Sequence, residues 1–303
     1  MAQGREPGLA RLLRAVSTVR VPDAVRAAFE ADPGDPAPGQ LWRMRWDEMV
    51  ELVLLRAVGD EDVFAVPVSL DDRLVDEDSV ILRPAQTSLG TTVVVWAALA
   101  RQLPMCVLDR QLGVVEVEVT DSNWIDRVID AGAGRGRATV SSLDPVHVVA
   151  ARTADALEVL AGASWAPSGS GELGSLLAAA QLGPPQLINL LDVSPQAALA
   201  LRRGQAAATP DQAARLAPVL HMSDRAILEA NPAPSPSLVQ KMSRPCRRAQ
   251  VNRLAVSRGI EERSAWLTAT YSVNAMAARQ TGMQVDPAWD ERIDQYFQIT
   301  LES

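Results

Sequence analysis

The apolar residues of this chain follow two different patterns along its length. From residue 40 to about 119, short β-branched runs are separated by turn residues, which predicts strands. The expected strands cover residues 41–46, 50–58, 63–68, 79–82, 91–97 and 114–119. Residues 101–112 are expected to form one helix or a loop with a helical turn. Outside this region the apolar residues recur at helical spacing, so the chain is expected to be α+β.

Residues 182–222 have the clearest helical pattern, interrupted by tight turns. The leucines of 187–191 share one helix face, and Ser194 followed by Pro195 is a typical start for a second helix. Gly204 marks the end of that helix, because glycine readily adopts the left-handed conformation. A third helix is expected to begin at Thr209-Pro210. Three short helices at this spacing predict a helix-turn-helix.

The same residues resemble the Xre (Cro-like) helix-turn-helix family over about 173–228. The matching positions are Leu182, Leu187, Leu191, Val193, Ser194, Gly204, Leu216, Ala217 and Leu220. Three positions depart from the family pattern: Asp192 occupies the turn, Pro184 replaces a glutamine that touches the DNA backbone, and Arg202 replaces a common glutamate. Asp tolerates turn geometry, and the added arginine favours an anionic partner.

The resemblance implies that the helix over residues 194–203 enters the major groove of DNA. Glutamine and arginine recognise adenine and guanine, and an alanine methyl group contacts thymine. The candidate base-reading residues are Ser194, Gln196, Ala197, Ala200 and Arg203, with Arg202 nearby. The alternative is a domain that keeps this shape but binds protein, because family likeness indicates fold better than function.

A run of basic residues follows this region. Between Asn231 and Gly259 there is no acidic residue, and the bases are Lys241, Arg244, Arg247, Arg248, Arg253 and Arg258. Such a run is typical of a phosphate-contacting surface, and we expect Lys241, Arg247 and Arg248 to contribute to DNA binding. The alternative is a helix that faces solvent or a protein partner.

Composition narrows the functional classes. The 303 residues include 29 Lys+Arg and 37 Asp+Glu, a formal net charge of −8, which argues against non-specific coating of nucleic acid. Cys106 and Cys246 provide no disulfide framework, and the longest apolar run, 93–100, is too short to span a bilayer. We therefore expect a cytoplasmic protein without a membrane segment. His147 and His221 are the only histidines, so neither a zinc site nor a cofactor is expected.

The strand-rich region weakly resembles the MazF/PemK toxins, small barrels that cut RNA. The resemblance rests on residues 38–42, 51–55, 65–69 and 112–115. Ser69 matches a position that helps catalysis in that family, but Asp47-Glu48 stands where the family has arginine. Because acidic residues repel an RNA phosphate, we expect a binding or scaffold domain and no enzyme activity. A generic SH3-like barrel is the alternative.

The expected organisation has five parts. They are N-terminal helices (1–30), a small antiparallel SH3-like β-barrel (38–120), a helical connector (121–170), the helix-turn-helix bundle (171–230) and a C-terminal helical module (237–303). The glycines of 130–137 are expected in a flexible connector. Trp289, Ile293, Tyr296 and Phe297 share one side of the last helix, as part of an ordinary bundle or of a dimer interface.

Together these patterns favour a sequence-specific transcriptional regulator, repressor or antitoxin-like, that binds double-stranded DNA. Binding to two half-sites implies a homodimer, and the barrel offers a surface for a protein partner. One rival is a MazF/PemK-like ribonuclease toxin whose helix-turn-helix regulates its own promoter. The other is a protein-binding scaffold.

Overall fold

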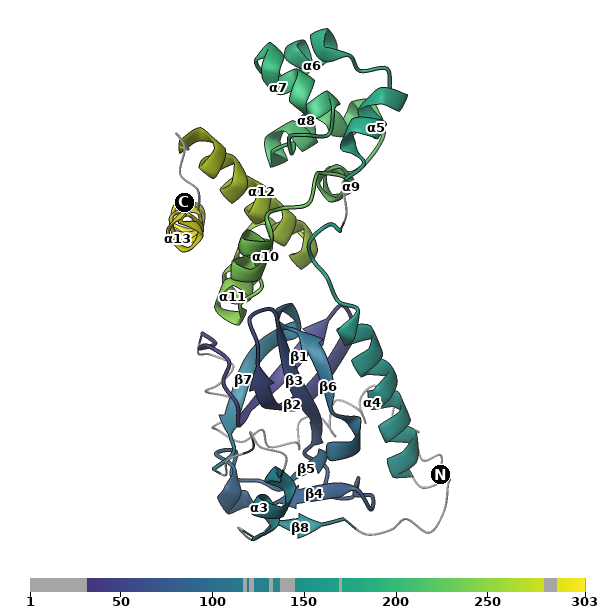
Figure 1. The fold of residues 1–303 in the computed structure, drawn as a ribbon, viewed down its shortest axis with the longest axis vertical. Helices are drawn as coiled ribbons and strands as arrows, with labels where there is room; N and C mark the ends of the chain where they lie inside the picture. The colour runs from purple at the N-terminus through teal and green to yellow at the C-terminus, as the bar shows by residue number, and fades with distance from the viewer. Residues whose placement is uncertain are drawn as a thin grey trace, which may run out of the picture.

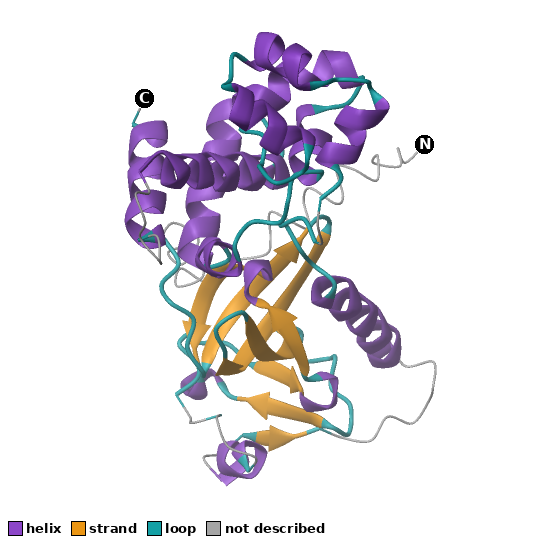
Figure 2. Cartoon of the chain, turned by 45° about the horizontal axis from the view of Figure 1, so that its top comes forward, coloured by secondary structure: helices purple, strands orange, loops and turns teal. Residues whose placement is uncertain are grey.

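A computed structural model gives the fold of this chain. It describes residues 32–116, 119, 123–130, 133–136, 145–168, 171–280 and 288–302. The predicted N-terminal helices, residues 1–30, lie outside the described residues. The fold is α+β, as the sequence predicts, with an antiparallel sheet at one end of an elongated molecule and helices at the other (Figures 1 and 2).

The sheet is built from eight strands in the order β7-β1-β2-β3-β5-β4-β8, and β6 pairs with β3 beside this path. The strands are β1 Gln40–Trp46, β2 Met49–Val58, β3 Asp62–Ser69, β4 Ser79–Leu82, β5 Val93–Trp96, β6 Arg101–Pro104, β7 Leu108–Val114 and β8 Gly134–Arg135. The first part of β3 pairs with β6 and its last residues pair with β5. Among the described residues, the first and last strands of this order do not pair with each other. The sheet is therefore open and does not close into a barrel.

Two segments of the sheet differ from the sequence prediction. Residues 101–112 do not form a helix: they form β6 and most of β7, joined by a short 3-10 turn at Met105–Val107. Leu103 and Leu108 are buried where these strands pair with β3 and β1, and this pairing prevails over the local helical pattern. Among the described residues, the strand expected over residues 114–119 is wrong apart from Val114, the last residue of β7, since the β1 ladder ends at the Gln40–Val114 pair and Val115 makes only an isolated bridge with Thr87.

The helices follow the sequence prediction more closely. Their bounds are α3 Trp124–Asp130, α4 Pro145–Ala161, α5 Leu173–Ala179, α6 Pro184–Leu191, α7 Pro195–Arg202, α8 Pro210–Leu220, α9 Asp224–Glu229, α10 Pro236–Met242, α11 Pro245–Arg258, α12 Glu262–Gln280 and α13 Trp289–Leu301. Two further 3-10 turns lie at Pro84–Gln86 and Ala97–Leu99. Within the glycine-rich segment predicted as a connector, Gly134–Arg135 adds a short strand to β4.

Three apolar cores hold these elements together. One lies inside the lower part of the sheet, and a second joins the upper part of the sheet to α4 and α10–α13. The third belongs to α5–α9 but includes Leu267 and Tyr271 of α12. Because α12 also places Trp266 and Val273 in the second core, this one helix connects the helical end of the molecule to the sheet (Figure 1).

The segment between α9 and α10, which includes Asn231, is firmly attached to its surroundings. Asn231 is fully buried, and its side chain accepts a hydrogen bond from the Ala208 amide and donates one to the Ala208 carbonyl, at 2.8 and 2.9 Å. The Tyr271 hydroxyl donates to the Pro232 carbonyl at 3.0 Å. This segment therefore ties the loop before α8 to α12.

Candidate nucleic-acid interface

The turn between α6 and α7 has the local geometry that its residues predict. Asp192 ends α6 in the left-handed region, with φ of 54°. Ser194 precedes α7 with extended backbone, and its hydroxyl accepts a hydrogen bond from the Ala197 amide at 3.2 Å. Pro195 occupies the first helical position, where its missing N–H is not needed. These features fix where α7 begins and in which direction it leaves the turn.

One side of α7 is anchored in the third core. Ala198 and Leu201 are buried there, and Gly204 ends the segment with φ of 66°. Gly174 of α5 lies so close that a Cβ on it would meet the Gly204 amide nitrogen at 2.8 Å. A side chain at residue 174 would therefore push α5 away from the end of α7. Small residues at this crossing hold α7 against the bundle.

The other side of α7 faces solvent at the far end of the molecule from the sheet (Figure 1). Ser194, Gln196 and Arg203 are exposed, as the sequence prediction requires of base-reading residues. Ala197 and Ala200 are half-buried, so their methyl groups are only partly accessible. The helix thus presents polar groups near its beginning and end and small apolar groups between them.

The sequence interpretation omitted one residue on this face. Leu199 is 39% exposed, an unusual position for a leucine on a short helix with an apolar core beside it. It follows Gln196 by three positions and precedes Arg203 by four, so the three side chains share one face. This helical spacing can be read from the sequence, so it could have identified Leu199 as part of the exposed face.

Arg202 differs from its neighbour Arg203. It is half-buried, and its Nη1 lies 3.4 Å from the Gly174 carbonyl, to which it donates. The guanidinium group is therefore held against α5, beside the exposed face of α7. Arg202 supports the position of α7 more directly than it offers charge to a ligand.

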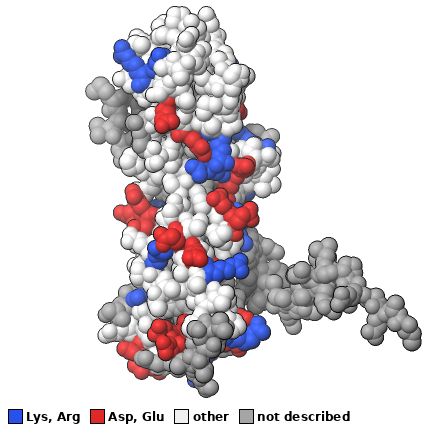
Figure 3. Space-filling view, turned by 90° about the vertical axis from the view of Figure 1, so that its right-hand side faces the viewer, with Lys and Arg blue, Asp and Glu red and all other residues white. Residues whose placement is uncertain are grey.

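On the face that Figure 3 shows, acidic and basic side chains are mixed, and neither sign dominates. They lie side by side over most of the length of this face. The upper end of this view is largely uncharged, with basic side chains near its edge. Non-specific attraction of nucleic acid needs a continuous basic surface, which this face lacks.

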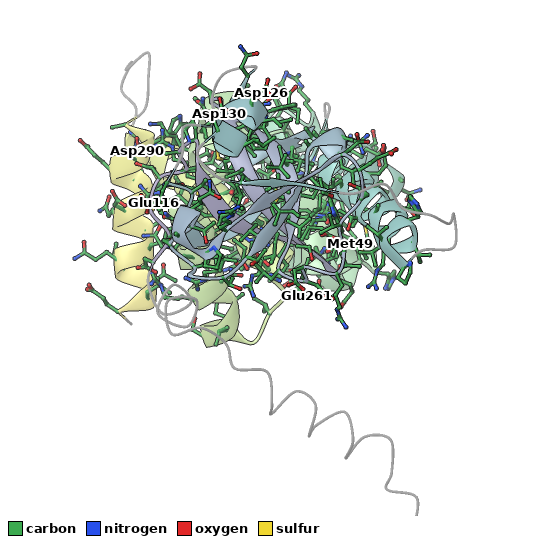
Figure 4. All side chains as sticks on the ribbon, turned by 90° about the horizontal axis from the view of Figure 1, so that it is seen from below. Met49, Glu116, Asp126, Asp130, Glu261 and Asp290 are labelled. Atoms are coloured by element: carbon green, nitrogen blue, oxygen red, sulfur yellow. The ribbon has the colours of Figure 1, made fainter. Side chains whose placement is uncertain are left out.

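The three bases that the sequence assigns to DNA binding, Lys241, Arg247 and Arg248, pair with acidic residues in the folded chain. Lys241 of α10 donates to Asp290 at 2.6 Å, and this contact holds the pKa of Asp290 below its usual range. Arg247 of α11 forms ion pairs with Asp294 and Asp290 of α13. Asp290 lies in the first turn of α13, at one end of that helix (Figure 4). These two bases therefore compensate the negative charges of Asp290 and Asp294 on α13.

Arg248 lies where no phosphate reaches it. It is 1% exposed, at the junction between the sheet and the C-terminal helices. Its guanidinium donates to Glu262 at 2.7 Å and to the carbonyls of Arg45 and Cys106 at 2.8 Å, and stacks over Trp266. The expectation that Arg248 binds DNA is therefore replaced by a structural role, because the sequence does not show that Glu262 faces it.

The aromatic side of the last helix is also internal. Trp289, Ile293, Tyr296 and Phe297 are buried and belong to the second core. They pack within the chain as an ordinary bundle, the alternative that the sequence leaves beside a dimer interface. A two-fold contact between copies would need another surface.

Ser69, which matches a catalytic position of the MazF/PemK toxins, makes a local hydrogen bond. Ser69 ends β3, and its hydroxyl accepts a hydrogen bond from the Asp71 amide at 3.0 Å. This contact shapes the turn after the strand. Glu48 lies in the turn between β1 and β2 and lines a cavity with Arg152 of α4.

In the described part of the chain, no group of three or more His, Cys, Asp or Glu side chains has an arrangement suited to a metal ion. Among the same residues, no helix has the length and apolar character needed to cross a bilayer. In comparisons with known proteins, no family model, curated protein or solved structure matches the chain. Function must therefore be argued from the geometry of α7 and its surroundings.

Proposed function

We propose that this protein is a sequence-specific DNA-binding regulator in which α6 and α7 act as a helix-turn-helix and α7 enters the major groove. The observation that carries the proposal is the exposure of Gln196, Leu199 and Arg203 on one face of a helix whose opposite face is anchored by Ala198 and Leu201. A reading helix needs such a face and a rigid support behind it.

The chemistry of this face suits base edges. Arg203 has the planar donor pair that guanine accepts in the major groove, and the Gln196 amide matches adenine. Leu199 and the half-buried Ala200 offer apolar contact to a thymine methyl group. Ser194 lies at the beginning of α7, beside the path of a DNA backbone. Specificity then depends on a short set of side chains, while Lys241, Arg247 and Arg248 no longer belong to it.

The test begins with selection of a bound duplex from a random pool by the full chain, followed by affinity measurement with that duplex. Replacing Gln196 and Arg203 with alanine should each weaken binding by about 1–3 kcal/mol, or roughly 5- to 150-fold, and relax base preference at one position. Arg73→Ala is the matched control, because this arginine is 85% exposed on the sheet domain.

Two results would overturn the proposal. Either the random pool yields no enriched sequence, or Gln196→Ala and Arg203→Ala bind the selected duplex as tightly as Arg73→Ala does.

The oligomeric state belongs to the same proposal. Helix-turn-helix regulators that read two half-sites act as two-fold dimers, so we propose a homodimer on DNA. Light scattering with and without the selected duplex tests it, and one chain per duplex would contradict it. The kinship of the sheet with SH3-like barrels and a protein partner on the sheet remain predictions, as does cytoplasmic location.

A further inference from the structure

A cavity of about 570 Å³ lies directly behind α7. Ala197 and Leu201 of α7 form one wall, and Tyr271 and Asn274 of α12 form the opposite wall. The loop before α8 and the segment Pro232–Ser235 form further walls, and the cavity is open to solvent on one side. Its size falls within the range of small-molecule sites, about 300–1,000 Å³. An occupant would touch the proposed reading helix and the helix shared by two cores.

The walls of this cavity are held in place without an occupant. Buried Asn231 fixes Ala208 through two hydrogen bonds, and Tyr271 fixes Pro232 through one. The prolines at 232 and 234 further restrict the backbone of their segment. A site formed before binding loses less conformational entropy when a ligand enters.

The lining has a definite chemistry. None of the described residues that line the cavity is Asp, Glu, Lys, Arg or His, so a charged ligand would find no opposite charge among them to compensate for lost hydration. The side-chain amides of Gln205 and Asn274 make no hydrogen bond to another described residue. An amide offers a donor and an acceptor side by side, which matches the edge of a nucleobase. Alanines and prolines provide flat apolar surfaces for a ring.

We propose that this cavity binds an uncharged nucleoside or nucleobase, whose ring edge pairs with Asn274 and Gln205, and that the occupant adjusts α7. The binding itself stands independently of the proposed DNA function. The effect on α7 rests on that function, since its readout is the affinity for DNA.

Binding is tested by isothermal titration and saturation-transfer NMR on the full chain, with adenosine, guanosine, cytidine and uridine and the corresponding 5′-monophosphates as probes. At least one nucleoside should bind, and its monophosphate should bind at least tenfold more weakly. Asn274→Leu should weaken the nucleoside at least tenfold, and Ala275→Trp, which fills the cavity, should abolish binding. Asn252→Leu on α11 is the matched control, because Asn252 does not line the cavity.

The proposal is overturned if none of the four nucleosides binds at millimolar concentration, if a monophosphate binds as tightly as its nucleoside, or if Asn274→Leu behaves like Asn252→Leu. Thermal unfolding of each variant identifies any that fails to fold. If Ala275→Trp does not fold, Asn274→Leu alone decides the result.

The coupling has its own readout. Saturating nucleoside should change the affinity for the selected duplex at least fivefold, within the usual range of coupling between sites. Nucleoside binding with unchanged duplex affinity would overturn the coupling and leave the site intact. If no duplex is selected, the DNA proposal fails, while the nucleoside titration still reports on the cavity.

Discussion

At the outer end of the molecule α7 directs Arg203 into solvent, whereas α11 directs Arg248 into the junction between the sheet and the C-terminal helices. Both arginines look alike along the sequence, on short helices with few acids nearby. Arg203 keeps its hydrogen-bonding groups accessible. The guanidinium group of Arg248 instead donates its hydrogen bonds to Glu262 and two backbone carbonyls.

The difference comes from elements that follow later in the chain. The acids that pair with Lys241, Arg247 and Arg248 are Asp290, Asp294 and Glu262, which lie on α12 and α13. A count of charge within a window of sequence cannot include them. Basic residues therefore indicate a ligand surface only when the fold leaves them without acids in space.

The largest effect is expected from breaking the junction. Arg248→Met should reduce the free energy of unfolding by about 3–5 kcal/mol, because two carbonyls lose their buried donor and Glu262 keeps only Arg45 as its partner among the described residues. Urea unfolding followed by tryptophan fluorescence measures this, since Trp266 lies against Arg248 and Trp165. Arg253→Met on the same helix is the control, with a side chain 51% exposed. A similar loss of stability in both variants would show that Arg248 does not stabilise the junction more than an exposed arginine of the same helix does.

The opposite behaviour is expected at α7. Arg203→Ala should weaken binding to the selected duplex by about 1–3 kcal/mol while changing the free energy of unfolding by less than about 0.5 kcal/mol. Electrophoretic mobility shift and urea unfolding on the same preparations separate the two quantities. If stability falls as far as affinity, Arg203 belongs with Arg248 and the comparison fails.

Glu51 of β2 extends the comparison to acids. It lines the cavity against α4 with Met49 and Arg152, and burial raises the pKa of its carboxyl from 4.5 to about 7, while Arg152 lowers it. The folded protein therefore binds more protons than the unfolded chain between pH 4.5 and about 7. Stability should fall as the pH rises through this window and stay reduced above it.

Glu51→Gln should remove this pH dependence. Relative to the original chain, the variant should gain about 1–2 kcal/mol between pH 5 and pH 8, a value reduced for the partial exposure of Glu51. Thermal and urea unfolding at several pH values measure the gain. Asp155→Asn, on α4 at the same cavity, is the control. Parallel pH profiles for Glu51→Gln and the original chain would refute the assignment.

The smallest effect is expected at Lys241. Its ion pair with Asp290 is partly exposed, so Lys241→Ala should cost less than about 1 kcal/mol of stability. The salt dependence of duplex binding should stay unchanged, because a base already paired with an acid releases no counterion from DNA. If duplex affinity depended less on salt concentration in this variant, Lys241 would contact DNA after all.

The sequence predicted the parts of this fold that depend on local chemistry. Ser194, Thr209 and Gly204 determine helix ends through contacts with residues three or four positions away, and each occupies its expected place. Most strands of the sheet were likewise readable from β-branched runs. Residues 101–112 were not, because their strand conformation depends on pairing with β3 and β1.

The candidate site divides in the same way. The exposed face of α7 follows from helical periodicity, so Gln196 and Arg203 were identified from sequence, and Leu199 was within reach of the same argument. The burial of Arg248 and the cavity beside Asn274 depend on how α12 crosses two cores. No window of sequence contains both sides of such a contact.

The position of α12 has a consequence for how this protein tolerates change in its length. Neighbouring residues Trp266 and Leu267 enter different cores. Inserting one residue before them would turn every later side chain by about 100°, so each core would receive the residues meant for the other. Surface loops accept added residues, but an insertion in α12 would disturb the packing of both the α5–α9 bundle and the sheet.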